Sequence, residues 1–167
     1  VREMTLAQLK QADPTIPSLA EALRLARGKC RVIVEIKHPH GSRHQDIENV
    51  LLKTLEQEKM LDQVVVISFD RQSLKTLRKM NASLETGYLF GAPTPLENLK
   101  KDLGITFVGP HFRLASAQFI AEAHALGLRV NAWTVDDPLD MRRLLQDCCD
   151  CITTDRPDRL LKLLATP

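Results

Sequence analysis

Short runs of apolar residues alternate with longer amphipathic segments along the whole chain. Six runs have the length and the β-branched composition of strands: residues 31–37, 64–69, 87–90, 105–108, 129–135 and 149–154. Most of them are apolar at consecutive positions, which is typical of strands buried on both faces of a parallel sheet. The segments between them, such as 46–60, 116–126 and 138–145, repeat apolar residues at helical spacing. The pattern therefore predicts an α/β fold built on a parallel sheet.

Residues that favour helix starts stand at the right places in this pattern. Ser18 is followed three residues later by Glu21, and Asp137 comes directly before Pro138. Thr94 also precedes a proline, so all three segments are expected to begin with a side-chain cap. The first of them, 17–27, predicts a helix in front of the first strand.

The spacing of the strands narrows the fold to two architectures. Successive strands lie roughly 20 to 30 residues apart, which is the length of one strand and one crossover helix. A TIM-type (β/α)8 barrel needs eight such units and typically about 250 residues, whereas this chain shows about six. An open doubly wound parallel sheet of six strands fits the length, and it stays the alternative. Residues 1–167 contain no linker and are expected to form a single domain.

Composition excludes several classes of protein. Of the 167 residues, 23 are Lys or Arg and 21 are Asp or Glu, which gives a net charge of +2. This balance provides no strong field for a polyanion, so no nucleic acid partner is expected. No apolar run approaches the roughly 18 residues of a transmembrane segment. The four cysteines are too few for a disulfide framework, and we interpret Cys148 and Cys151 as strand-end residues and not as a zinc site.

Candidate chemistry is expected at the carboxyl ends of the strands, where sites of parallel α/β proteins form. Glu35 and Lys37 end the first strand and share one face of it. Burying both charges is costly unless they are paired, hydrated or bound to a ligand, so this strand end favours a site over a plain ion pair. The next loop holds His38, His40 and His44, which we interpret as a solvated turn and not as a ligand set.

Other strand ends carry further candidates. Trp133, the only tryptophan, ends the fifth run beside Thr134, where an aromatic wall of a ligand pocket would lie. His111 follows the fourth run and joins it as a candidate substrate-binding residue. Asp70 and Asp155 also follow strands, but both are explained as helix caps.

These strand ends together resemble the glycerophosphodiester phosphodiesterase family. The matching segments follow one another over almost the whole chain: Ile16 to Leu23, Val34-Glu35-Ile36-Lys37, Val65 to Asp70, Gly127 to Pro138 (with Trp133-Thr134-Val135) and Ile152 to Asp158 (with Thr154-Asp155-Arg156-Pro157). The resemblance implies a TIM-type barrel, of which strands three to eight are present here.

The resemblance also implies roles for individual residues. Glu35 matches a carboxylate ligand of a divalent cation, Ca²⁺ or Mg²⁺, and Lys37 matches the lysine that neutralises the phosphodiester. Trp133 matches the aromatic wall of the substrate pocket. The implied substrate is a small glycerophosphodiester, hydrolysed to an alcohol and glycerol 3-phosphate in lipid metabolism. The expected location is the cytoplasm.

The front of the family pattern is missing from this sequence. Members begin with a His-Arg-Gly strand, a Glu-x-Asp pair and a His-Asp strand end, which carry the catalytic histidines and the other metal carboxylates. None of these occurs here. We therefore expect the chain to be a fragment, the C-terminal three-quarters of such a barrel, and to be inactive alone.

Two other interpretations stay open at this stage. Lys37 could form a Schiff base in a lyase, because strand-end lysines do so when they are desolvated. The chain could also be a non-catalytic binding module derived from the same barrel. Whether the chain is a fragment of an enzyme or a binding module, a barrel with two strands missing has exposed edges, which favour self-association.

Overall fold

The computed structural model describes residues 4–38 and 44–165, and its centre is one sheet of six parallel strands. Strand order follows the chain without reversal, so each strand pairs with the one before it. The strands are β1 (Val32–Ile36), β2 (Val64–Ser68), β3 (Glu85–Phe90), β4 (Phe107–Pro110), β5 (Arg129–Ala132) and β6 (Cys151–Ile152). A doubly wound sheet reverses its order at a switch point, so that alternative is wrong. The six predicted strands are all confirmed, with bounds shifted by a few residues.

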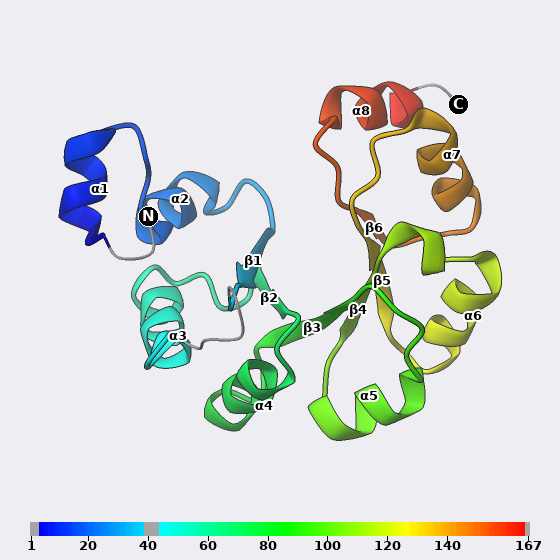
Figure 1. The fold of residues 1–167 in the computed structure, drawn as a ribbon, viewed down its shortest axis with the longest axis horizontal. Coiled ribbons are helices and arrows are strands. Elements are labelled where there is room, and N and C mark those ends of the chain that lie inside the picture. Colours follow the sequence, from blue (N-terminus) through cyan, green and yellow to red (C-terminus); the bar gives the residue numbers. More distant parts are fainter. Residues whose placement is uncertain (1–3, 39–43, 166–167) are drawn as a thin grey trace.

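Helices surround the outside of this curled sheet (Figure 1). Helices α1, α2 and α3 lie at one end of the arc, and α7 and α8 lie at the other. Their bounds are α1 (Leu6–Ala12), α2 (Leu19–Ala26), α3 (Ile47–Gln57), α4 (Arg71–Met80), α5 (Leu96–Leu103), α6 (Ala117–Ala125), α7 (Pro138–Gln146) and α8 (Pro157–Ala165), with a short 3-10 helix η2 (Phe112–Leu114). The result is an incomplete barrel, a half-barrel with its helices outside.

The predicted helix caps are formed at two of three positions. Ser18 and Glu21 make a reciprocal capping box at α2, and Asp137 accepts a hydrogen bond from the backbone of Leu139 at α7. The prediction that Thr94 caps α5 is wrong, because Pro95 takes the N-cap position. The Thr94 hydroxyl donates to the Ala92 carbonyl oxygen instead. A proline supplies no side-chain acceptor, so this helix begins without a side-chain cap.

The core lies between the sheet and the helices. Alternate strand residues, among them Val64, Val66, Val108 and Val130, are fully buried against the helices. The residues between them face the hollow side of the sheet, which we call the inner face. Gly109 on β4 shows how tightly this face is filled, because a Cβ atom there would lie 2.4 Å from Leu89 Cδ2.

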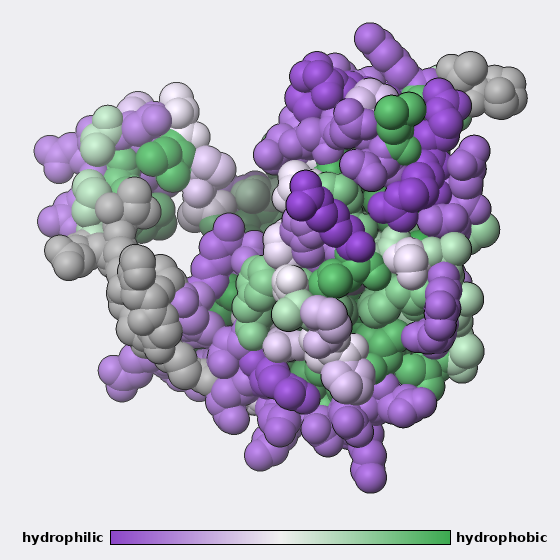
Figure 2. Space-filling view, turned by 45° about the vertical axis from the view of Figure 1, so that its right-hand side comes forward, coloured by the Kyte–Doolittle hydropathy of each residue, from purple (hydrophilic) through white to green (hydrophobic). Residues whose placement is uncertain are grey.

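The sheet is open at both ends of the arc. Among the described residues, β1 pairs with β2 alone and β6 pairs with β5 alone. Figure 2 shows an open hollow between the part that carries α1 and α2 and the part that carries α7 and α8. In the described ranges, no helix combines the length and the apolar character needed to cross a membrane.

Candidate functional site

A pocket of about 230 Å³ opens at the carboxyl ends of the strands, and we call it the strand-end pocket. It brings together three of the four predicted site residues, Glu35, Lys37 and Trp133, from opposite ends of the sheet. Its full lining is Glu35, Lys37, Ile67, Phe69, Leu89, Asn131, Trp133, Thr134 and Thr153. All except Thr134 follow the every-second-residue alternation of one strand face, and this periodicity is what collects them on the inner face.

Glu35 and Lys37 form an ion pair at the rim of the pocket. The Glu35 Oε2 atom lies 3.3 Å from the Lys37 Nζ atom. The lysine side chain is 75% exposed and the glutamate side chain 28% exposed. The ammonium group therefore stays hydrated and can reach an incoming anion. A Schiff-base lysine needs desolvation to lower its pKa, so this exposure gives the lyase interpretation no support.

Trp133 presents only its ring to the pocket. Its indole Nε1–H donates a 2.6 Å hydrogen bond to the Gly109 carbonyl oxygen. Edge-on contacts to Phe69, at 5.3 Å between ring centroids, and to His111, at 5.4 Å, fix the ring further. With its donor already used, the indole offers only its apolar ring surface to the pocket, and its role as the wall of a ligand site stays a prediction.

His111 lies behind Trp133 and not in the lining of the strand-end pocket. Its ring packs at 4.7 Å from Phe112 and its Nδ1 accepts a hydrogen bond from the backbone of Arg113. His111 therefore touches Trp133 but does not itself line the pocket. Its contact with the tryptophan gives it a role in holding the pocket wall.

The strand-end pocket fits a divalent cation only in part. Among its described lining residues Glu35 is the one carboxylate, while Ca²⁺ takes six to eight oxygen ligands and Mg²⁺ takes six. Glu35 is partly buried and shares the pocket lining with Thr134 and Thr153, so it suits one ligand position. The remaining ligands would have to be water, substrate or groups outside this set.

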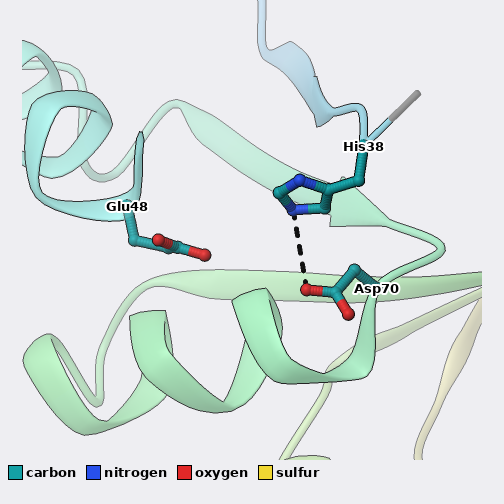
Figure 3. A group of neighbouring side chains, drawn as sticks. All are labelled: His38, Glu48 and Asp70. Atoms are coloured by element: carbon teal, nitrogen blue, oxygen red, sulfur yellow. Dashed lines mark ion pairs between the residues drawn. The ribbon is translucent and has the colours of Figure 1, made fainter. Parts of the chain in front are cut away.

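A second group of possible ligands lies on the other side of β1. Atoms of His38, Glu48 and Asp70 lie within 4.8 Å of one another (Figure 3). The Ser73 hydroxyl stands among them, 2.8 Å from His38 Nε2, 2.6 Å from Glu48 and 3.0 Å from Asp70. Because one hydroxyl already contacts all three groups, we interpret this cluster as a polar network that fastens the end of β1 to α3 and α4.

This network corrects one expectation and confirms another. The prediction that the histidine loop is a solvated turn is wrong for His38, whose side chain is only 8% exposed. His40 lies outside the described residues, and His44 is exposed. The predicted cap role of Asp70 is confirmed by its hydrogen bonds from the backbone of Gln72 and Ser73.

Sequence reasoning missed two polar residues of the strand-end pocket, as well as its apolar walls. Asn131 stands two positions before Trp133, and Thr153 lies on the neighbouring chain segment after β6. The alternation of strand faces alone could have placed Asn131 beside the tryptophan. No local signal points to Thr153, because its approach to Asn131 depends on how the strands pair.

The amino end of the inner face carries a separate charged cluster. Glu85 of β3 pairs with Arg31, at 2.8 Å, and with Arg129 of β5. The Arg129 guanidinium also lies 3.8 Å from the centre of the Phe107 ring. Partial burial alone would raise the pKa of Glu85, but the two arginines outweigh it and the pKa lies below its ordinary value.

Fold and pocket together define a barrel-type α/β protein whose site lies at the carboxyl ends of its strands. The model of the glycerophosphoryl diester phosphodiesterase family matches residues 1–159. The chain belongs to this family.

Individual relatives agree with this assignment. A glycerophosphodiester phosphodiesterase from Caldanaerobacter subterraneus is 26% identical over 98% of this chain and 72% of its own length. One from Bacillus subtilis is 25% identical over 98% of this chain and 65% of its own. The crystal structure of a family member from Parabacteroides distasonis is 29% identical and superposes with a TM-score of 0.77, covering 90% of this chain and 64% of that one.

An Oleispira antarctica phosphodiesterase solved with the product sn-glycerol-3-phosphate shares the fold. It has a TM-score of 0.81 at 20% identity and covers 90% of this chain and 62% of that one. The chain thus spans about two thirds of the length of the relatives that it matches.

The paired Glu85 makes stability depend on pH in a defined way. Its pKa in the folded protein lies below the ordinary value of 4.5, so its stabilising contribution is complete above that value and is lost as pH falls through the lower, folded-state pKa. We expect Glu85→Gln to lower the thermal unfolding midpoint at pH 7. At acidic pH the midpoints of the variant and the parent protein should become equal. Thermal unfolding followed by circular dichroism from pH 7 to pH 2 measures this.

The exposed Glu56 provides the control for Glu85. Glu56→Gln removes the same charge from the surface of α3, and we expect little change in the midpoint at any pH. If the difference in unfolding midpoint between Glu85→Gln and the parent stayed constant down to pH 2, the lowered pKa of Glu85 would be contradicted.

Proposed function

We propose that this chain supplies part of the active site of a glycerophosphodiester phosphodiesterase that acts in lipid metabolism. The reaction would be hydrolysis of a small glycerophosphodiester to an alcohol and glycerol 3-phosphate. The observation that carries the proposal is the convergence of Glu35, Lys37 and Trp133 on one pocket at the carboxyl ends of the strands. Membership of the family supports it, as do the activities named for the relatives.

In this reaction water attacks the phosphorus atom, the bond from phosphorus to the alcohol oxygen breaks, and that oxygen takes up a proton. Negative charge grows on the phosphoryl oxygens, and the exposed ammonium of Lys37 would neutralise it. A divalent cation, Ca²⁺ or Mg²⁺, would supply further positive charge, with Glu35 as one ligand. Trp133, Phe69, Ile67 and Leu89 provide the apolar walls against which the carbon skeleton would lie.

Proton transfer needs more than the described pocket offers. Apart from Glu35 and Lys37, its lining contains no charged side chain and no histidine. The histidines of the family's His-Arg-Gly and His-Asp segments have no counterpart among the 167 residues. We therefore propose that the described residues, which we treat as one domain, bind and orient the substrate without completing the proton transfers.

Ligand binding tests the role of Lys37 directly. We expect sn-glycerol 3-phosphate to change the fluorescence of Trp133, the only tryptophan, in a saturable way. Lys37→Gln removes the ammonium group and should weaken binding about tenfold or more, since a hydrogen bond to a charged group contributes ~1.5–3 kcal/mol. The exposed Lys101 on α5 provides the control, and Lys101→Gln should bind like the parent. Equal affinity of all three proteins would exclude this role.

A turnover assay tests whether this chain binds the substrate without completing the reaction. We expect the 167-residue chain to show no release of glycerol 3-phosphate from glycerophosphocholine, with or without added Ca²⁺ or Mg²⁺, in a coupled assay of the product. Hydrolysis that both EDTA and Glu35→Ala abolish would refute this expectation, because it would place complete catalysis in this chain.

The open sheet supports a proposal of self-association between copies of this chain. Strand β1 leaves one edge unpaired, and a mainly apolar groove of about 220 Å³ runs beside it, lined by residues that include Leu19, Val34 and Val50. At the other end Leu161 and Leu164 of α8 are 65% and 60% exposed. An unpaired strand edge favours pairing with another strand, and the exposed leucines of α8 add apolar surface near the other end of the sheet.

Sizing chromatography with light scattering measures this self-association. We expect the apparent mass to rise above 18.8 kDa with protein concentration. A compact monomer at every concentration would refute pairing through the edges. A stable dimer that binds no sn-glycerol 3-phosphate would favour the alternative of a non-catalytic binding module.

A further inference from the structure

Asn131 of β5 is a polar residue in the strand-end pocket whose amide is held in one orientation. The residue is 2% exposed and lines the pocket together with Lys37 and Trp133. Its Oδ1 atom accepts a 2.9 Å hydrogen bond from the Thr153 hydroxyl. Among the residues that the structure describes, its Nδ2 group has no hydrogen-bond partner. The acceptor of this side chain is therefore used, while its two N–H donors stay available.

The Asn131 Nδ2 group is not among the fully buried polar atoms that lack a partner, so a water or a ligand in the pocket can satisfy its donors. Asn131 does not pack on the helices, where apolar residues fill the space, but faces the inner side of the sheet. The hydrogen bond from Thr153 engages the amide oxygen and so leaves the amide nitrogen available for a ligand. Without that hydroxyl the amide could rotate and present its oxygen instead.

The donors of the pocket suggest which ligand atom they bind. The indole N–H of Trp133 is already taken by Gly109, so it cannot serve a ligand. The Lys37 ammonium and the Asn131 amide then remain as nitrogen donors in the lining, and the surrounding walls of Ile67, Phe69 and Leu89 are apolar. A phosphoryl oxygen carries negative charge and only accepts hydrogen bonds, which matches this set.

We propose that Asn131 is a ligand-binding residue, whose Nδ2 donates a hydrogen bond to a phosphoryl oxygen in the strand-end pocket, and that Thr153 is its positioning residue. The identity of the phosphorylated ligand rests on the proposed function. The donor role of Asn131 holds for any phosphate ester or free phosphate that enters the pocket.

The test uses Asn131→Asp, which keeps the acceptor for Thr153 and replaces the amide N–H donors with an acceptor. Titration with sn-glycerol 3-phosphate, followed by the fluorescence of Trp133, should show at least about tenfold weaker binding than the parent. Asn98→Asp, at an exposed position of α5, adds the same charge away from the pocket and should leave binding unchanged. Thr153→Val should weaken binding by a smaller factor, because it frees the amide to rotate.

Nuclear magnetic resonance keeps the proposal testable if Asn131→Asp fails to fold. In the parent protein the side-chain NH₂ resonances of Asn131 should shift on titration with sn-glycerol 3-phosphate or with inorganic phosphate. Asn98 should show no such shift. An unperturbed Asn131 resonance at saturating ligand, or unchanged affinity of a folded Asn131→Asp variant, overturns the proposal.

The two ligands separate this proposal from the proposed function. Inorganic phosphate binding that depends on Asn131, without any binding of sn-glycerol 3-phosphate, supports the donor role and argues against the glycerophosphodiester site. Binding of sn-glycerol 3-phosphate that depends on Lys37 but not on Asn131 leaves the proposed function standing and refutes the donor role. No response to either ligand overturns the role of Asn131 as well.

Discussion

The alternation of side chains along parallel strands is the constraint on which this structure depends. Each strand sends every second residue outward to the helices and the others to the inner face. Val34 and Ile36 of β1 therefore join the packed side, while Glu35 faces inward with Lys37, and the same rule separates Val130 and Ala132 from Asn131 and Trp133. A one-residue shift of register would exchange the two sets and place charges in the core. Stability of the outer layer thus fixes the positions of the polar groups that make the site.

Much of the fold and part of the site could be predicted from the sequence. Strands were predictable because buried parallel strands are continuous apolar runs, and Glu35, Lys37 and Trp133 were found because they end such runs. The burial of His38 could not be predicted, because it comes from Ser73, Glu48 and Asp70 on later elements. The pairing of Asn131 with Thr153 depends likewise on strand neighbours and leaves no local signal.

The strand-end pocket is asymmetric in what its groups can do. One end of the sheet contributes the charges of Glu35 and Lys37, and the other contributes the neutral amide of Asn131 and the ring of Trp133. The proposed ligand, a small phosphate ester, would place an anionic oxygen near the lysine and the amide, and a short carbon skeleton against the ring.

Glu85 connects the amino ends of strands that are not neighbours. Its carboxylate binds Arg31 in front of β1 and Arg129 on β5, so it spans the hollow of the arc from one side to the other. In a closed barrel the ring of hydrogen bonds fixes the curvature, but an open arc has no such ring. The ion pairs of Glu85 link the start of β1 to β3 and β5 across the concave side and so resist flattening of the sheet. They thereby help to preserve the distance between the pocket residues that follow β1 and those on β5.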